Sequence, residues 1–209
     1  MRSAELIEQN LSAASPPPAH RPPRRRQLLL SSLAQLYGKS SVHGLVMALR
    51  DCARALAASD AIAVVHREDD MVHYVAEDAI APLWEGERFP AEGCISGLAM
   101  LENRPILIPD IYADCRVPHE IYKATFVRSM AMFPIGLANP VWALGAYWAE
   151  PAAFDREAVT LLASLARSAA FAFERLAPQS PDGPPDGLRA SDNATTMDQS
   201  LIPPPRSIC

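Results

Sequence analysis

The residues of this 209-residue chain that could do chemistry gather between Gly93 and Gly136. This segment holds two of the four cysteines, Cys94 and Cys115, together with His119. Three kinds of site fit such a set: a catalytic thiol, a metal or pigment attachment site, and a pocket wall that only binds. The surrounding side chains favour the third, because a binding pocket needs mostly apolar walls and a few converging polar groups.

The expected pocket residues are apolar walls and polar anchors. Alternation along a strand sends every second side chain inward, so aromatic and methionine side chains of the segment and of the following hairpin supply walls. The expected walls are Tyr112, Tyr122, Phe126, Met130, Met132, Tyr147 and Trp148, and the expected anchors are Asp110, Asp114, Arg116, His119 and Arg128. Cys94 and Cys115 complete the set of candidate ligand contacts. An ordinary core for the aromatics, and a structural ion pair of Asp110 with Arg128, remain open as alternatives.

Thiol chemistry is the first competing hypothesis. A nucleophilic cysteine needs a base or a positive local field that favours the thiolate. Cys94 starts a predicted short helix, whose dipole could lower the thiol pKa, and Cys115 adjoins Arg116 and lies four residues before His119. We favour a small buried packing residue for Cys94, and we expect no catalytic residue.

A metal site is not expected either. The histidines His43, His66 and His73 stand singly, and the cysteines lie far apart without a CxxC pair or finger spacing. Structural zinc sites need ligands at short, repeated spacings. The acidic residues 68–70 fall in a predicted hairpin turn, where solvated charge is usual.

Composition defines the expected domain. The 20 prolines concentrate in residues 16–23 and beyond Leu176, where neither helical nor strand periodicity is present. Such segments bury too little apolar surface to offset their ordering entropy. We therefore expect a disordered lead-in (1–26), one folded domain (27–176) and a disordered tail (177–209).

Charge and hydropathy limit the partners. The formal net charge of −5 does not attract nucleic acid, and no apolar stretch approaches the roughly 20 residues that cross a membrane. The N-terminus has no apolar segment of the signal-peptide kind. Scattered cysteines indicate reduced thiols, so we expect a cytoplasmic protein with neither a nucleic-acid nor a membrane partner.

Periodicity predicts an α+β fold. Apolar spacing indicates helices, and short β-prone runs separated by turn residues indicate two hairpins. Ser40 or Ser41 is expected to cap the second helix, and Asp155 the last one. The expected elements are helices at 27–37, 41–58 and 155–176, strands at 61–66, 71–76, 129–136 and 141–150, and an irregular middle at 79–128. This order predicts an antiparallel sheet with helices on one face and an irregular pocket lid on the other.

Five segments, in order, resemble the motifs of GAF domains, the small-molecule sensing modules of signalling proteins. They are GCISGLAM for the element opening the pocket helix, RPILIPDIYAD for a strand and loop, FVRSMAMFPI and VWALGAYWAE for two strands, and FDREAVTLLASLARSAAFAFE for the closing helix. The match spans residues 28–176. Each motif is weak alone, but five in this order and spacing are specific.

The likeness is strongest to the GAF domains that precede bacterial sensor histidine kinases, including the HWE type. The chain departs from them at Trp142, where many GAF domains have glycine, and at Cys115, where similar domains have proline. No dimerisation helix or nucleotide-binding lobe is expected after Leu176, so no kinase reaction is expected. The resemblance implies a stand-alone, non-enzymatic sensor of an unknown small molecule in a two-component system, with a signalling kinase acting in trans. The last helix has a small, apolar outer face, and GAF domains commonly dimerise through their terminal helices. Together these imply a homodimer through the terminal helices.

The family also contains the competing activities. Phytochrome-like GAF domains attach a bilin through a cysteine, which makes Cys115 with His119 the alternative site for a tetrapyrrole, bilin or haem. GAF-fold methionine sulfoxide reductases use cysteines in this region, but their motif does not match the surroundings of Cys94 or Cys115. No element typical of cyclic-nucleotide-binding GAF domains is present. We expect no cofactor.

Overall fold

A six-stranded antiparallel sheet forms the centre of the computed structural model, which describes residues 24–177. The strand order is β3-β2-β1-β6-β5-β4. The strands are β1 (Ala61–Glu68), β2 (Met71–Ala79), β3 (Arg88–Pro90), β4 (Ile106–Ile108), β5 (Ser129–Ile135) and β6 (Trp142–Trp148). The helices are α2 (Arg24–Tyr37), α3 (Val42–Ala57), α4 (Ile95–Leu101), α5 (His119–Tyr122) and α6 (Arg156–Leu176), with a 3₁₀ turn, η1, at Ala91–Gly93. The α+β architecture expected from periodicity is confirmed.

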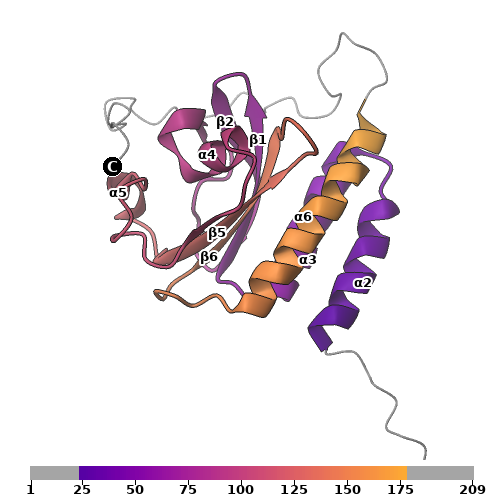
Figure 1. Ribbon diagram of the computed structural model, residues 1–209, viewed down its shortest axis with the longest axis horizontal. Coiled ribbons are helices and arrows are strands. Elements are labelled where there is room, and N and C mark those ends of the chain that lie inside the picture. The colour runs from indigo at the N-terminus through magenta and orange to yellow at the C-terminus, as the bar shows by residue number, and fades with distance from the viewer. Residues whose placement is uncertain (1–23, 178–209) are drawn as a thin grey trace, which may run out of the picture.

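The two faces of the sheet carry different layers (Figure 1). Helices α3 and α6 pack on one face, and α2 packs outside them, while α4 and α5 lie on the opposite face. We call these the helix face and the lid face. The predicted arrangement of helices on one face and a loop-rich lid on the other is therefore present.

The long helices begin where their capping residues predict. The Ser41 hydroxyl accepts a hydrogen bond from the Gly44 amide at 3.1 Å, and the Asp155 carboxylate accepts one from the Ala158 amide at 2.6 Å. Both caps satisfy amides that the first turn of a helix leaves free. Of the two expected caps for α3, Ser41 is the one used.

Helix α2 begins three residues before the predicted start, within the arginine cluster. The Arg25 guanidinium lies 2.7 Å from the Asp155 carboxylate and 3.8 Å from that of Glu157, so it joins α2 to the first turn of α6. Arginines 24–26, which were expected to belong to the disordered lead-in, therefore belong to this helix. The rest of the predicted lead-in and nearly all of the predicted tail lie outside the described residues.

A β-bulge decides which side chains of β2 face the lid. Val64 pairs with Ala76, but its neighbour Val65 pairs with Tyr74, so Val75 is an extra residue on β2. An extra residue reverses the alternation of faces along a strand. Tyr74 therefore faces the lid, whereas Ala76 faces the helices.

The middle segment, expected to be irregular, is more ordered than its sequence indicates. It contains β3, η1, α4, β4 and α5, each seven residues or shorter. Elements this short lack the repeated periodicity by which a helix or strand is found in a sequence. Within residues 24–177, no helix combines the length and apolar character needed to cross a membrane.

Candidate functional site

Four aromatic side chains meet between the sheet and the lid segments. Tyr74 comes from β2, Tyr147 from β6 and Tyr122 from α5, while Trp84 belongs to the loop between β2 and β3. The Trp84 ring lies 5.5 Å from that of Tyr74, 5.0 Å from Tyr122 and 5.7 Å from Tyr147, each edge to face. We call these four residues the tyrosine cluster. None is more than 5 % exposed.

A short row of polar atoms crosses this apolar surrounding. The Ser96 hydroxyl on α4 lies 3.3 Å from the Tyr74 hydroxyl and 3.3 Å from the Cys94 sulfur. The Tyr122 hydroxyl donates a long contact, 3.9 Å, to the Met130 sulfur. These groups are buried, and buried polar groups in native proteins are usually hydrogen-bonded.

The Tyr147 hydroxyl is the exception. It is buried and makes no hydrogen bond to any described residue. The hydroxyls of Tyr74 and Tyr147 influence each other's pKa, but they do not meet with hydrogen-bond geometry. An orphaned hydroxyl inside a cluster of aromatic rings is a group available to a ligand.

Gly145 makes room for this hydroxyl. A Cβ atom at Gly145 would lie 2.7 Å from Tyr147 Oη and 3.0 Å from the Met132 methyl group. Gly145 and Tyr147 are two residues apart on β6 and so share a face, which lets the tyrosine ring lie back over the glycine. A side chain at this position would displace the tyrosine hydroxyl from the cluster.

Gly97 allows close packing within the lid, as Gly145 does on the sheet. A Cβ atom there would lie 1.9 Å from the Ala91 carbonyl oxygen, so only glycine permits the contact between α4 and η1. This close contact holds α4 over the sheet and brings Ser96 to Tyr74. Gly97, the second of the two glycines in the GCISGLAM segment, is thus required by packing.

Burial keeps the site uncharged. Loss of water raises the pKa of Tyr74, Tyr122 and Tyr147 above the usual value of 10, and it raises the pKa of the Cys94 thiol above 9. The Cys94 thiolate is therefore disfavoured at neutral pH, which argues against a nucleophile at this position. Neutral hydroxyls and a neutral thiol can recognise a ligand by hydrogen bonding.

Five of the expected wall and contact residues lie together at this site. They are Cys94, Tyr122, Met130, Met132 and Tyr147, and Phe126 packs against their edge. The wall expected from Trp148 is wrong. Trp148 belongs to the helix face, where its ring lies 5.4 Å from that of Phe154.

The expected polar anchors form a separate group nearer the surface. The Arg116 guanidinium donates two hydrogen bonds to the Asp114 carboxylate, at 2.9 and 2.6 Å, which lowers the pKa of Asp114. A ring nitrogen of His119 lies 3.1 Å from the Asp114 carbonyl oxygen. Cys115, between these residues, is exposed. These side chains contact one another and stabilise the loop.

The alternative ion pair of Asp110 with Arg128 is not formed. The Asp110 carboxylate accepts the Tyr112 amide at 3.0 Å and so closes a local turn. The Arg128 guanidinium lies over the Tyr112 ring, 5.2 Å from its centre, in a cation–π contact. Tyr112 is 43 % exposed and forms no part of the buried cluster.

Tyr74, Trp84, Ser96 and Gly145 are the site residues that sequence reasoning missed. Tyr74 stood in a predicted strand, but its orientation depends on the bulge at Val75. Trp84 lies in a loop without periodicity, and a large apolar residue in a loop is the signal that could have indicated it.

Comparison with known proteins places this geometry in a family. Residues 22–174 match the family model of the GAF domain. None of the curated protein sequences compared with the chain matches it significantly.

Solved structures show the same fold at low sequence identity. The GAF domain of a phosphoenolpyruvate-protein phosphotransferase from Acinetobacter has a TM-score of 0.67 at 12 % identity, covering 78 % of this chain and all of that one. A free methionine-R-sulfoxide reductase from Neisseria meningitidis in complex with its substrate gives 0.62 at 16 %, covering 73 % and 89 %. The chromophore-binding domain of a bacteriophytochrome from R. palustris gives 0.62 at 13 %, covering 75 % and 63 %. With the family model spanning most of its length, this chain belongs to the GAF domain family.

Proposed function

We propose that this GAF domain is a non-catalytic sensor that binds a small molecule in the tyrosine cluster. The observation that carries the proposal is the buried Tyr147 hydroxyl without a hydrogen-bond partner among the described residues. Leaving a buried polar group unpaired costs about 1–3 kcal/mol. A ligand that bonds to this hydroxyl recovers that free energy and thereby favours the bound state.

The same cluster indicates the class of ligand. Burial keeps neutral the hydroxyls of its three tyrosines and the thiol of the neighbouring Cys94, and no ionised side chain belongs to the cluster. Burying a charge without a partner is costly, so the site favours an uncharged molecule. Three tyrosines and a tryptophan favour a flat or aromatic body with one or two hydrogen-bonding groups.

Binding requires a rearrangement of the lid, because the cluster is packed. Tyr74 and Tyr147 stand on hydrogen-bonded strands, whereas Trp84 and Tyr122 stand on a loop and on the four-residue α5. The Glu77 carboxylate holds the Trp84 loop by accepting the amides of Leu83 and Trp84 at 2.7 and 2.8 Å. We infer that a ligand enters by displacing Trp84 and Tyr122 and selects a minor, open population.

The output of the sensor is proposed to pass through the terminal helices. Leu30 on α2 is 64 % exposed and Phe171 on α6 is 50 % exposed, and exposed large apolar side chains support a contact with another chain. We propose that α2 and α6 form a homodimer interface. The cytoplasmic partner is then a signalling kinase of a two-component system, as the likeness to GAF domains of HWE-type kinases suggests.

The proposal includes no tetrapyrrole, metal or other cofactor. A bilin is larger than the ligand proposed here and would have to displace Tyr147 as well as Trp84 and Tyr122, and each of these residues is at most 5 % exposed. Within residues 24–177, no group of three or more histidine, cysteine or acidic side chains could hold a metal ion. The competing tetrapyrrole site at Cys115 and His119 is tested by the first experiment.

The first experiment is an absorbance spectrum of protein purified with and without a supply of bilin and haem. We expect no visible band. A band lost on Cys115→Ala would replace the proposal with a tetrapyrrole sensor.

The second experiment is a thermal-shift screen of uncharged aromatic metabolites against the wild type and Tyr147→Phe. Because a bound ligand stabilises the folded state, we expect hits that raise the melting temperature of the wild type. Loss of the hydroxyl should weaken such a hit about tenfold, while Tyr37→Phe, an exposed control, should leave it unchanged. Equal shifts for all three proteins would contradict the site.

A further inference from the structure

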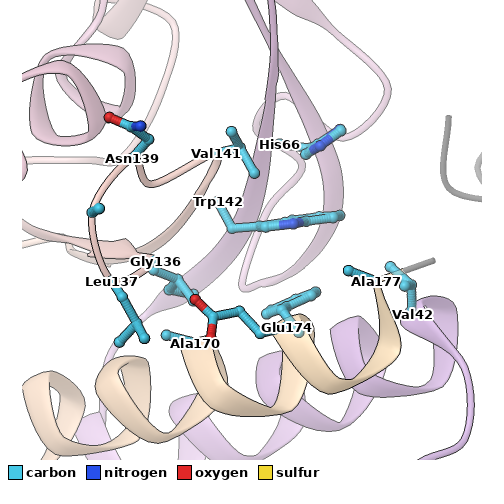
Figure 2. Close-up of a pocket in the computed structure, with 13 residues that line it drawn as sticks. Val42, His66, Gly136, Leu137, Asn139, Val141, Trp142, Ala170, Glu174 and Ala177 are labelled. Carbon is cyan, nitrogen blue, oxygen red and sulfur yellow. The ribbon is translucent and has the colours of Figure 1, made fainter. Parts of the chain in front are cut away.

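A second site lies on the helix face, away from the tyrosine cluster. A cavity of about 390 Å³ opens between the β5–β6 hairpin, the start of α3 and the end of α6. Figure 2 shows its walls. The hairpin residues Gly136, Leu137, Asn139, Val141 and Trp142 lie on one side, and Ala170 and Glu174 of α6 lie on the other with Ala177, which follows the helix. Its volume falls in the range of roughly 300–1,000 Å³ that is typical of small-molecule sites.

The cavity has a rigid aromatic floor. The Trp142 indole stacks on the His66 ring at 4.1 Å with an interplanar angle of 28°, and on the Phe173 ring at 4.5 Å and 17°. The indole thus makes two stacking contacts, one with a ring from β1 and one with a ring from α6. A ligand therefore contacts the edge of this three-ring stack, in the position where the sequence departs from the glycine of many GAF domains.

The hairpin wall is held in one shape. A Cβ atom at Gly136 would lie 2.5 Å from the Pro140 Cα atom, so the loop closes tightly on itself and only glycine fits. Beyond it, Leu137 is 51 % exposed and Val141 is 40 % exposed at the rim of the cavity. A preformed cavity with an apolar rim binds without the ordering cost that the packed tyrosine cluster imposes.

The charged side chain that lines the cavity is negative. Glu174 is the one ionised side chain among the residues that line it, and its carboxylate lies on the cavity side of α6 (Figure 2). The last turn of α6 ends at Leu176 and adds the negative end of the helix dipole. Both features repel an anion and favour a cation.

His66 supplies a second, independent feature. Its side chain is 10 % exposed, and its Nδ1 atom makes no hydrogen bond. Glu68 Oε1 lies 3.4 Å from Nδ1, a distance of electrostatic contact without hydrogen-bond geometry. Burial lowers the pKa of His66 below 6.5, so the ring is uncharged at neutral pH and does not oppose a bound cation.

From these observations we propose that the cavity binds a small primary amine with an apolar or aromatic body. The ammonium group pairs with Glu174, and the body fills the space between the hairpin and the Trp142 stack. This site is distinct from the proposed lid site and lies against α6, the helix through which the output is proposed to pass. An amine bound here contacts the sheet and the terminal helix at once.

The test uses three probes with the same body: 2-phenylethylamine, 2-phenylethanol and phenylacetate. Binding to the full chain is followed by ¹⁵N–¹H NMR of the three tryptophan indole groups, with the Trp142 signal assigned from Trp142→Phe. We expect the amine to shift the Trp142 signal and to bind about tenfold more tightly than phenylacetate. Glu174→Gln should remove most of that preference and leave the alcohol unaffected.

Matched variants make the result decisive. Glu92→Gln removes an exposed carboxylate elsewhere and should change nothing. Ala170→Leu should fill the cavity and abolish binding of all three probes, whereas Ala163→Leu, on α6 outside the cavity, should not. Binding that survives Ala170→Leu, or equal affinities for amine and carboxylate in the wild type, would overturn the proposal. Loss of amine binding on Tyr147→Phe would move the amine to the lid site instead.

Discussion

The two faces of the sheet are covered by different elements and bury different kinds of side chain. The helix face is covered by α3 and α6 and buries leucine, alanine and other apolar residues. The lid face is covered by short elements and loops, and it contains all three buried tyrosines of the described residues, together with Cys94 and Ser96. The difference teaches that the helix face buries mostly hydrocarbon, whereas the lid face holds most of the buried polar groups.

The physical reason lies in what covers each face. Long helices satisfy their own backbone groups and present continuous apolar stripes, so they bury hydrocarbon without polar cost. Short elements and loops bring polar groups with them, as the Ser96 hydroxyl and the backbone amides of Leu83 and Trp84, which the Glu77 carboxylate must accept, show. Buried polar groups reduce stability when they are unpaired, and they give specificity when a ligand pairs them.

The largest effect should come from the helix face. Leu162 on α6 is fully buried among the leucines and alanines of that face. Leu162→Ala should lower the free energy of unfolding by about 2–5 kcal/mol, because it removes buried methyl groups and leaves a cavity. Urea denaturation measures the loss, and Thr160→Ala, on the exposed side of α6, should cost far less. Equal losses would contradict the role given to this face.

A smaller effect is expected on the lid face at Gly145. Gly145→Ala places a methyl group 2.7 Å from Tyr147 Oη, so the tyrosine must shift. We expect a loss of about 1–3 kcal/mol, the usual cost of overpacking, together with weaker binding of any lid ligand. Gly93→Ala is the matched control, because its nearest contact would be an ordinary 3.8 Å. A Gly145→Ala protein with wild-type stability and ligand binding would show that the glycine does not position Tyr147.

The smallest expected effect is the dependence of stability on pH. Burial lowers the pKa of His66 and His73 below 6.5, so the unfolded chain takes up protons that the folded chain resists. The contribution of these two histidines to the free energy of unfolding is fully present above about pH 6.5. It is lost as the pH falls from there through their folded-state pKa values. The slope is at most about 1.4 kcal/mol per pH unit for each histidine. Denaturation midpoints between pH 7.5 and 5 should show it, and His66→Phe should flatten it.

The tyrosine cluster should act at the opposite end of the pH scale. Burial raises the pKa of Tyr147. Its contribution to the free energy of unfolding is therefore present below about pH 10 and is lost as the pH rises beyond that value. Ultraviolet titration should show Tyr74, Tyr122 and Tyr147 ionising only as the protein unfolds. Ionisation of these three tyrosines in a folded protein would contradict the packed lid.

The sequence by itself determined the elements whose signals are local. Helical spacing with the caps Ser41 and Asp155 predicted α3 and α6, and turn residues between β-prone runs predicted both hairpins. The ordered motifs then predicted the GAF fold. Local signals suffice here because a cap or a turn depends on neighbours a few residues away.

Only the tertiary structure decided which side chains meet. The bulge at Val75 turns Tyr74 toward the lid. Alternation of side chains along β6 places Trp148 on the helix face. The loop whose amides bond to Glu77 brings Trp84 into the tyrosine cluster. The charged anchors expected around Asp114 pair with each other near the surface. A composition rich in polar residues does not reveal such pairing, because the partners of a side chain depend on strand register and loop path, which no short stretch of sequence specifies.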